Sequence, residues 1–77
     1  MTRAEVHAML MTLIELFHGR LADATSIAAA SKACAGAGNL DEAIRISLQI
    51  DQPLYDATKL SDAAALLKRM ADNGEID

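Results

Sequence analysis

Two histidines are the side chains in this sequence whose type and spacing best suit chemistry. His7 and His18 are eleven positions apart, which in a helix places them within about 20° on one face but about 16 Å apart along the axis. One chain therefore cannot direct both at a single metal ion. In an antiparallel pairing of two copies, His7 of one chain would approach His18 of the other. This pairing leaves open a metal- or pH-responsive role.

The other reactive residue types do not form a catalytic site. Cys34 lies near the C-terminal end of a predicted helix, where the helix dipole does not stabilise a thiolate, so we expect a structural role. Asp41 and Glu42 are adjacent and diverge by about 100° in a helix. The sequence contains no nucleophile triad, phosphate-binding glycine loop or calcium loop. We therefore expect no enzyme activity, no cofactor and no metal site.

Charge and composition exclude further classes of function. The 77 residues include seven basic and eleven acidic ones, for a net charge of −4. This balance opposes nucleic-acid binding, which depends on Lys and Arg contacts to phosphates. The apolar runs are shorter than the roughly 18 residues of a membrane span, and Glu5 and Glu15 disfavour a secretory signal. We expect a cytoplasmic protein that binds neither nucleic acid nor membrane, and its single cysteine suits a reducing compartment.

The elements that must position these residues are predicted to be helices. The sequence has one proline, four glycines and no sustained apolar–polar alternation. Thr2 and Glu5 form a capping box, and the helix that follows covers about residues 3–18 and ends with Gly19 in the left-handed conformation. Its large apolar residues form one wide face: Val6, Met9, Leu10, Leu13, Ile14, Leu16 and Phe17.

The next two predicted helices differ in the size of their side chains. Residues 21–35 are rich in alanine, and small side chains let neighbouring helices approach closely, so we expect a central helix touched on two sides. Gly36 to Gly38 end it, and Asn39 with Glu42 predicts a second capping box. Over residues 40–50 the predicted apolar stripe consists of Leu40, Ala43, Ile44, Ser47 and Leu48, widened by Ile46 and Ile50.

The last predicted helix covers residues 53–72 and contains a break near 59–61. Pro53 suits a first helical turn, Ser61 suits the N-cap of a new start, and Gly74 lies just past the end. Together the segments predict a single helical domain over residues 1–77. Its fold class is all-α, a small bundle of about four helices arranged as two helical hairpins.

The stretch Ser31–Arg45, with the sequence SKACAGAGNLDEAIR, resembles the turn of a helical-hairpin repeat. Tetratricopeptide and pentatricopeptide repeats carry a similar glycine, polar cap and Glu-Ala-Ile at this juncture. The resemblance covers one unit, roughly residues 23–55, and implies an antiparallel helix pair. Ser31 stands where a tetratricopeptide unit usually has glycine and Ile50 where it has alanine, and the sequence contains no second copy.

The wide apolar faces of residues 3–18 and 40–50 exceed what one neighbouring helix covers, which predicts an interface. We expect a non-catalytic protein–protein interaction module, a homodimer that self-associates through its first helix. Met and Phe adapt well at recognition surfaces, and the predicted contact residues are Met9, Leu13, Leu16 and Phe17. One alternative is a small acidic chaperone or antitoxin-like inhibitor of a basic partner. Another is a metal- or pH-responsive protein that uses His7 and His18.

Overall fold

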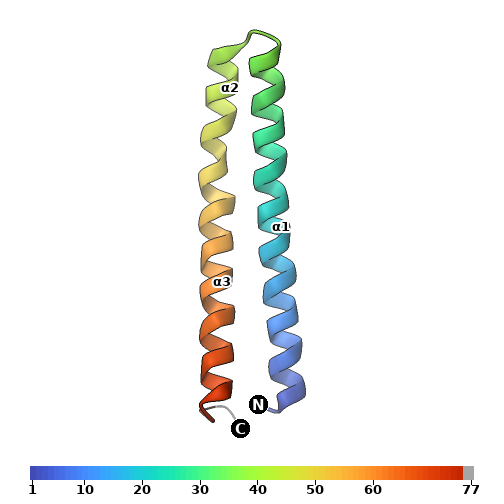
Figure 1. Cartoon of the computed structure of the whole chain (residues 1–77), viewed down its shortest axis with the longest axis vertical. Coiled ribbons are helices and arrows are strands. Elements are labelled where there is room, and N and C mark those ends of the chain that lie inside the picture. The colour runs from blue at the N-terminus through green and yellow to red at the C-terminus, as the bar shows by residue number, and fades with distance from the viewer. Residues whose placement is uncertain (76–77) are drawn as a thin grey trace.

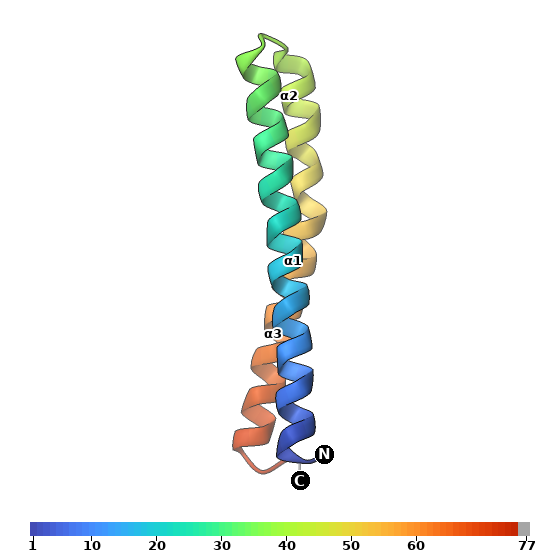
Figure 2. The ribbon, with the colours of Figure 1, turned by 90° about the vertical axis from the view of Figure 1, so that its right-hand side faces the viewer.

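The computed structural model describes residues 1–75 as two long helical arms joined by a tight turn (Figure 1). The first arm is α1 (Arg3–Gly36). The second arm consists of α2 (Leu40–Ser47), a 3-10 turn η1 (Leu48–Ile50) and α3 (Asp51–Asp72). The arms run antiparallel, so the start of α1 and the end of α3 lie together at what we call the open end. The turn between the arms forms the tip (Figures 1 and 2).

The chain is all-α, as predicted, but the predicted bundle of about four helices is wrong. The two arms form one extended hairpin with dimensions of 57 × 15 × 11 Å and a Cα radius of gyration of 17.4 Å. A compact domain of this length would have a radius of gyration of about 11.5 Å. Each arm has a single neighbour, the other arm. The alanine-rich half of α1 is therefore touched on one side and is not a central helix.

α1 continues through Gly19, so the predicted helix end at this residue is wrong. Among the described residues only Gly38 and Gly74 have a positive φ. A glycine inside a helix costs about 0.5–1 kcal/mol relative to alanine. Ending the helix there would cost more, because each new helix end leaves four backbone groups without an intrahelical partner.

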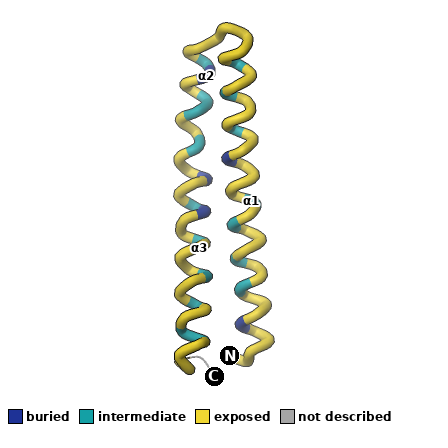
Figure 3. Tube along the Cα trace, in the orientation of Figure 1, coloured by how far each residue is buried: buried dark blue, intermediate teal, exposed yellow. Residues whose placement is uncertain are grey.

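The positions that face the other arm explain why both arms stay continuous. Along α1, buried and half-buried residues recur at alternating spacings of three and four, with the exposed Arg20 completing the series: Val6, Leu10, Leu13, Phe17, Ala24, Ile27, Ser31 and Cys34. The second arm has the same spacing: Ala43, Ile46, Ile50, Pro53, Ala57, Leu60, Ala64, Leu67 and Ala71. This is the heptad pattern of a coiled coil. The covered positions lie on the facing sides of the two arms (Figure 3), and we call them the seam.

The irregular turn of the second arm lies at Leu48–Ile50, and the predicted break near 59–61 is wrong. Pro53 has no N–H to donate to the carbonyl of Gln49, and its ring crowds that carbonyl. The helix therefore tightens locally into a 3-10 turn. Pro53 lies in the first turn of α3, as predicted, and is buried. Ser61 lies within the unbroken helix and caps no new start.

The predicted signals at the two outer helix ends are confirmed. Thr2 Oγ1 accepts a hydrogen bond from the Glu5 N–H at 3.1 Å, and Glu5 Oε1 accepts one from the Thr2 N–H at 3.0 Å. These two bonds form the complete capping box. Gly74 follows the end of α3 with a φ of +73°. Local sequence therefore determines where the first arm begins and the second arm ends.

The tip closes through backbone hydrogen bonds around Gly38, whose φ is +85°. The Gly38 N–H donates to the Ala35 carbonyl and the Asn39 N–H donates to the Cys34 carbonyl, which is the Schellman arrangement. Asn39 Oδ1 accepts a hydrogen bond from the Glu42 N–H at 3.2 Å. The Asn39 N–H is already used by this closure, and the Glu42 carboxylate pairs with Arg45. The predicted second capping box is therefore only half formed.

Candidate functional site

Large apolar side chains remain at the surface along the whole hairpin. Within residues 1–75, the buried residues other than Pro53 are Val6, Ala24, Ala43 and Ala57, at 2–7 % exposure, and three of these four are alanines. The exposed large apolar residues within the arms are Met9, Met11, Ile14, Leu16, Leu21, Leu40, Ile44, Leu48, Leu54, Tyr55 and Leu66. A single neighbour cannot cover both sides of an arm, so the apolar surface of this fold exceeds what its two arms hide from water.

The structure divides the four predicted contact residues into two pairs. Met9 is 46 % exposed and Leu16 is 50 % exposed, and because they are seven positions apart they lie on the same flank of α1. Leu13 and Phe17 are half-buried in the seam. Met9 and Leu16 are therefore available to a partner, whereas Leu13 and Phe17 mainly hold the arms together.

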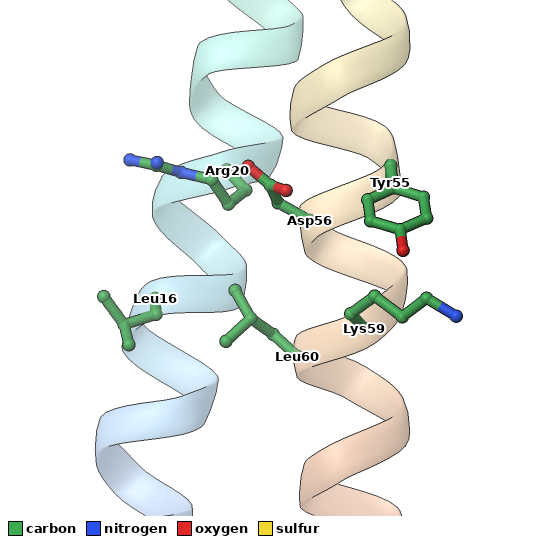
Figure 4. Close-up of a pocket in the computed structure, with 6 residues that line it drawn as sticks. All are labelled: Leu16, Arg20, Tyr55, Asp56, Lys59 and Leu60. Carbon is green, nitrogen blue, oxygen red and sulfur yellow. The ribbon is translucent and has the colours of Figure 1, made fainter.

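A shallow hollow of about 420 Å³ lies beside Leu16, between the two arms. It is lined by Leu16 and Arg20 from α1 and by Tyr55, Asp56, Lys59 and Leu60 from α3 (Figure 4). The Leu60 side chain extends from α3 toward α1 (Figure 4), and Leu60 and Leu16 are the aliphatic residues of the lining. Charged groups of both signs therefore line the hollow together with these leucines.

The charged groups at this hollow have partners within their own arms. Arg20 Nη2 lies 3.1 Å from Asp23 Oδ2 in an ion pair that is open to solvent. The Gln52 side-chain amide donates to Asp56 Oδ1 at 2.8 Å. The Lys59 ammonium lies 5.2 Å from the centre of the Tyr55 ring, a cation–π distance. None of these contacts crosses the hollow.

A smaller hollow of about 260 Å³ lies on α1 and is lined by Ala8, Met9, Thr12 and Leu13. It neighbours the hollow beside Leu16, because Met9 and Leu16 share a flank. We call Met9, Leu13, Leu16 and Leu60 the open-end flank. This flank combines protruding apolar side chains with apolar recesses.

The opposite side of the open end carries a more polar hollow of about 450 Å³. Arg3, His7, Lys68 and Asp72 are among its lining residues, and Lys68 Nζ donates to both Asp72 carboxylate oxygens at 2.6–2.7 Å. This ion pair is exposed to solvent, so it contributes little to stability. A partner on this side would have to displace water from charged groups.

The structure does not bring the histidines or the cysteine together. His7 lines the polar hollow, and His18 is exposed further along the same continuous helix. Cys34 is half-buried in the seam within the last turn of α1. Within residues 1–75, no group of three or more His, Cys, Asp or Glu side chains is arranged to hold a metal ion.

A second apolar surface, from the predicted stripe over residues 40–50, faces solvent although none of its residues was named as a contact residue. Leu40, Ile44 and Leu48 are 62–66 % exposed. The predicted stripe over residues 40–50 spans two faces of one helix, and α1 covers only the face that contains Ala43 and Ile50. The acidic residues spaced along the outer face are the sequence signal that could have revealed this orientation.

No family model matches the sequence, and no curated protein or solved structure matches it either. Neither arm, within the described residues 1–75, has an apolar segment long enough to cross a bilayer. Function is therefore inferred from the surface of this chain alone.

Proposed function

We propose that this chain is a non-catalytic protein–protein interaction module that forms a homodimer through the open-end flank. Its accessible surface of 5485 Å² supports this proposal. A compact monomer of the same mass would expose about 4,500 Å². The excess of about 1,000 Å² is comparable to the roughly 800 Å² that each partner buries in a standard interface.

The open-end flank suits a two-fold dimer better than the opposite side does. A two-fold interface uses the same patch on both copies, so the patch must complement itself. The protruding Met9 and Leu16 side chains lie next to apolar recesses, and each copy can fill the recesses of the other. Arg20, Lys59 and Asp56 supply both signs of charge at the rim, which allows favourable pairing across the interface. The opposite side also has apolar lining residues, Val6, Leu10 and Ala71, but Arg3, His7, Lys68 and Asp72 line the same hollow, and a partner there would have to displace their hydration.

The test is the oligomeric state of the Leu16→Asp variant. Leu16 is half-exposed and lies outside the seam, so the variant should keep its helical circular dichroism spectrum. We expect sedimentation velocity to show a dimer for the unmodified chain at micromolar concentration and a monomer for Leu16→Asp. The apolar contact area at the centre of the interface would be replaced by a charge that loses its hydration.

Ile14→Asp is the matched control. Ile14 is 52 % exposed, and because it precedes Leu16 by two residues, its side chain points about 160° away. We expect Ile14→Asp to remain a dimer. A monomeric unmodified chain at micromolar concentration would contradict the proposal, and so would equal loss of self-association in both variants.

A further inference from the structure

A second apolar surface lies on the outer side of the second arm, toward the tip, and we propose that it binds a basic amphipathic helix of another protein. We call Leu40, Ile44, Leu48 and Tyr55 the outer row. Leu40, Ile44 and Leu48 are spaced four residues apart and therefore form one ridge, and Tyr55 follows seven positions later. All four side chains are 59–66 % exposed. Folding of the hairpin leaves this ridge without a partner.

Three carboxylates share the outer row's side of the helix. At 100° per residue, Asp41, Asp51 and Asp62 lie within about 60° of Ile44 around the helix axis. The ion pairs among residues 1–75 are Arg20–Asp23, Arg45–Glu42 and Lys68–Asp72. The three outer carboxylates are therefore unpaired within the described part of the chain. The lysine on this side, Lys59, lies over the Tyr55 ring.

Charge complementarity identifies the occupant. An apolar ridge bordered by unpaired carboxylates matches a helix with an apolar stripe and Lys or Arg at its edges, because opposite charges steer and align the two surfaces. A second copy would not suit this surface, since two outer rows facing each other would bring their carboxylates together. Anionic lipid headgroups and nucleic-acid phosphates would be repelled for the same reason.

The carboxylate spacing specifies the partner further. Asp41 and Asp51 are ten positions apart, and Asp51 and Asp62 are eleven apart, which corresponds to about 15–17 Å of helix in each case. A partner helix that lies along the row meets successive carboxylates if its basic residues are spaced ten or eleven positions apart. A helix of about 22 residues spans all three.

The test uses two synthetic helical peptides of about 22 residues and the full chain. Both peptides carry a leucine stripe, and they differ only in having lysine or glutamate at three edge positions with this spacing. We expect fluorescence anisotropy to show saturable binding of the lysine peptide and at least about tenfold weaker binding of the glutamate peptide. Ile44→Ser should weaken binding of the lysine peptide about tenfold, because it removes a central apolar contact.

A charge exchange separates this docking from general attraction to an acidic protein. Asp51→Lys should weaken binding of the lysine peptide and strengthen binding of the glutamate peptide. Ile14→Ser, on the first arm, should leave the binding of both peptides unchanged. Leu16→Asp should keep its peptide binding, because Leu40, Ile44 and Leu48 lie outside the proposed dimer interface and, of the outer row, only Tyr55 borders the hollow beside Leu16. Equal binding of both peptides, or unchanged binding by Ile44→Ser in a folded chain, would overturn the proposal.

Discussion

The two halves of the hairpin are held together by side chains of different size. In the open-end half, the seam contains Leu10, Leu13 and Phe17 on one arm and Leu60 and Leu67 on the other, all half-buried. Large side chains contribute most of the apolar area, but one neighbour cannot cover them. This half therefore has the most to gain from a partner.

In the tip half, the seam positions that reach nearly complete burial include two small alanines, while the larger Ile27, Ile46 and Ile50 are half-buried. Ala24 and Ala43 are 5 % and 4 % exposed, and alanine allows the two helices to approach closely. Ser31 Oγ donates to the Ala43 carbonyl at 2.7 Å across the arms, a contact that also requires close approach. In the open-end half Val6 is buried at 7 % exposure, but the other large seam residues stay half-buried, whereas in the tip half the most covered seam residues are alanines.

The largest expected effect comes from placing a large side chain in the tip half. Ala43→Leu adds bulk at a buried, closely packed position, so we expect the free energy of unfolding to fall by about 1–3 kcal/mol. Urea denaturation followed by circular dichroism measures this change. Ala64→Leu is the matched substitution at a half-buried seam position of the open-end half and should cost less than about 1 kcal/mol. Equal losses would mean that the two halves pack alike.

Substitution by alanine should change the stability of the chain in opposite directions at two of its glycines. Gly38 has a φ of +85° at the tip, so Gly38→Ala should destabilise the chain by about 1–2 kcal/mol through backbone strain alone. Gly19 lies within α1 and has no atom within 4 Å of an added Cβ. Gly19→Ala should therefore raise stability by up to about 1 kcal/mol.

Thermal unfolding of the two glycine variants at matched protein concentration separates these outcomes. A destabilised Gly19→Ala variant would show that α1 needs a glycine at this position. A neutral Gly38→Ala variant would show that the tip has another way to close.

The smallest expected effect is a pH dependence at the open end. Hydrogen bonds from Thr2 hold the pKa of Glu5 below its ordinary value of 4.5. Because the folded pKa is the lower one, this contribution to stability is present above pH 4.5 and is lost as the pH falls through the folded value. Glu5→Gln keeps the capping geometry. Between neutral pH and about pH 3, its melting temperature should fall less than that of the unmodified chain.

The tip provides the comparison for this titration. Arg45 lowers the pKa of Glu42 through its side-chain hydrogen bonds. The contribution of Glu42 to stability is therefore also lost at acid pH, as it is for Glu5. Glu42→Gln should likewise reduce the acid-dependent loss, but it also removes the ion pair with Arg45. Identical acid profiles of Glu5→Gln and the unmodified chain would show that the cap at Thr2 does not respond to ionisation.

The candidate surfaces were predictable to different degrees. Met9 and Leu16 belong to an apolar face too wide for one neighbour, and the structure exposes both. Ile44 and Leu48 belong to an equally wide face that was also predicted to exceed one neighbour, but neither was among the predicted contact residues, and the structure exposes both. The apolar pattern of residues 40–50 is compatible with either side facing inward, so this pattern alone could not distinguish the seam from the outer row.

The sequence by itself determined the helical character of the chain and the places where its arms begin and end. Thr2, Gly38 and Gly74 act through hydrogen bonds and backbone conformations within a few residues, so these signals need no distant partner. The tertiary structure alone decided that α1 passes through Gly19 and α3 through Ser61. It also decided which apolar face turns inward. The physical reason is that these choices depend on the heptad seam, whose energy comes from contacts between residues far apart in the chain.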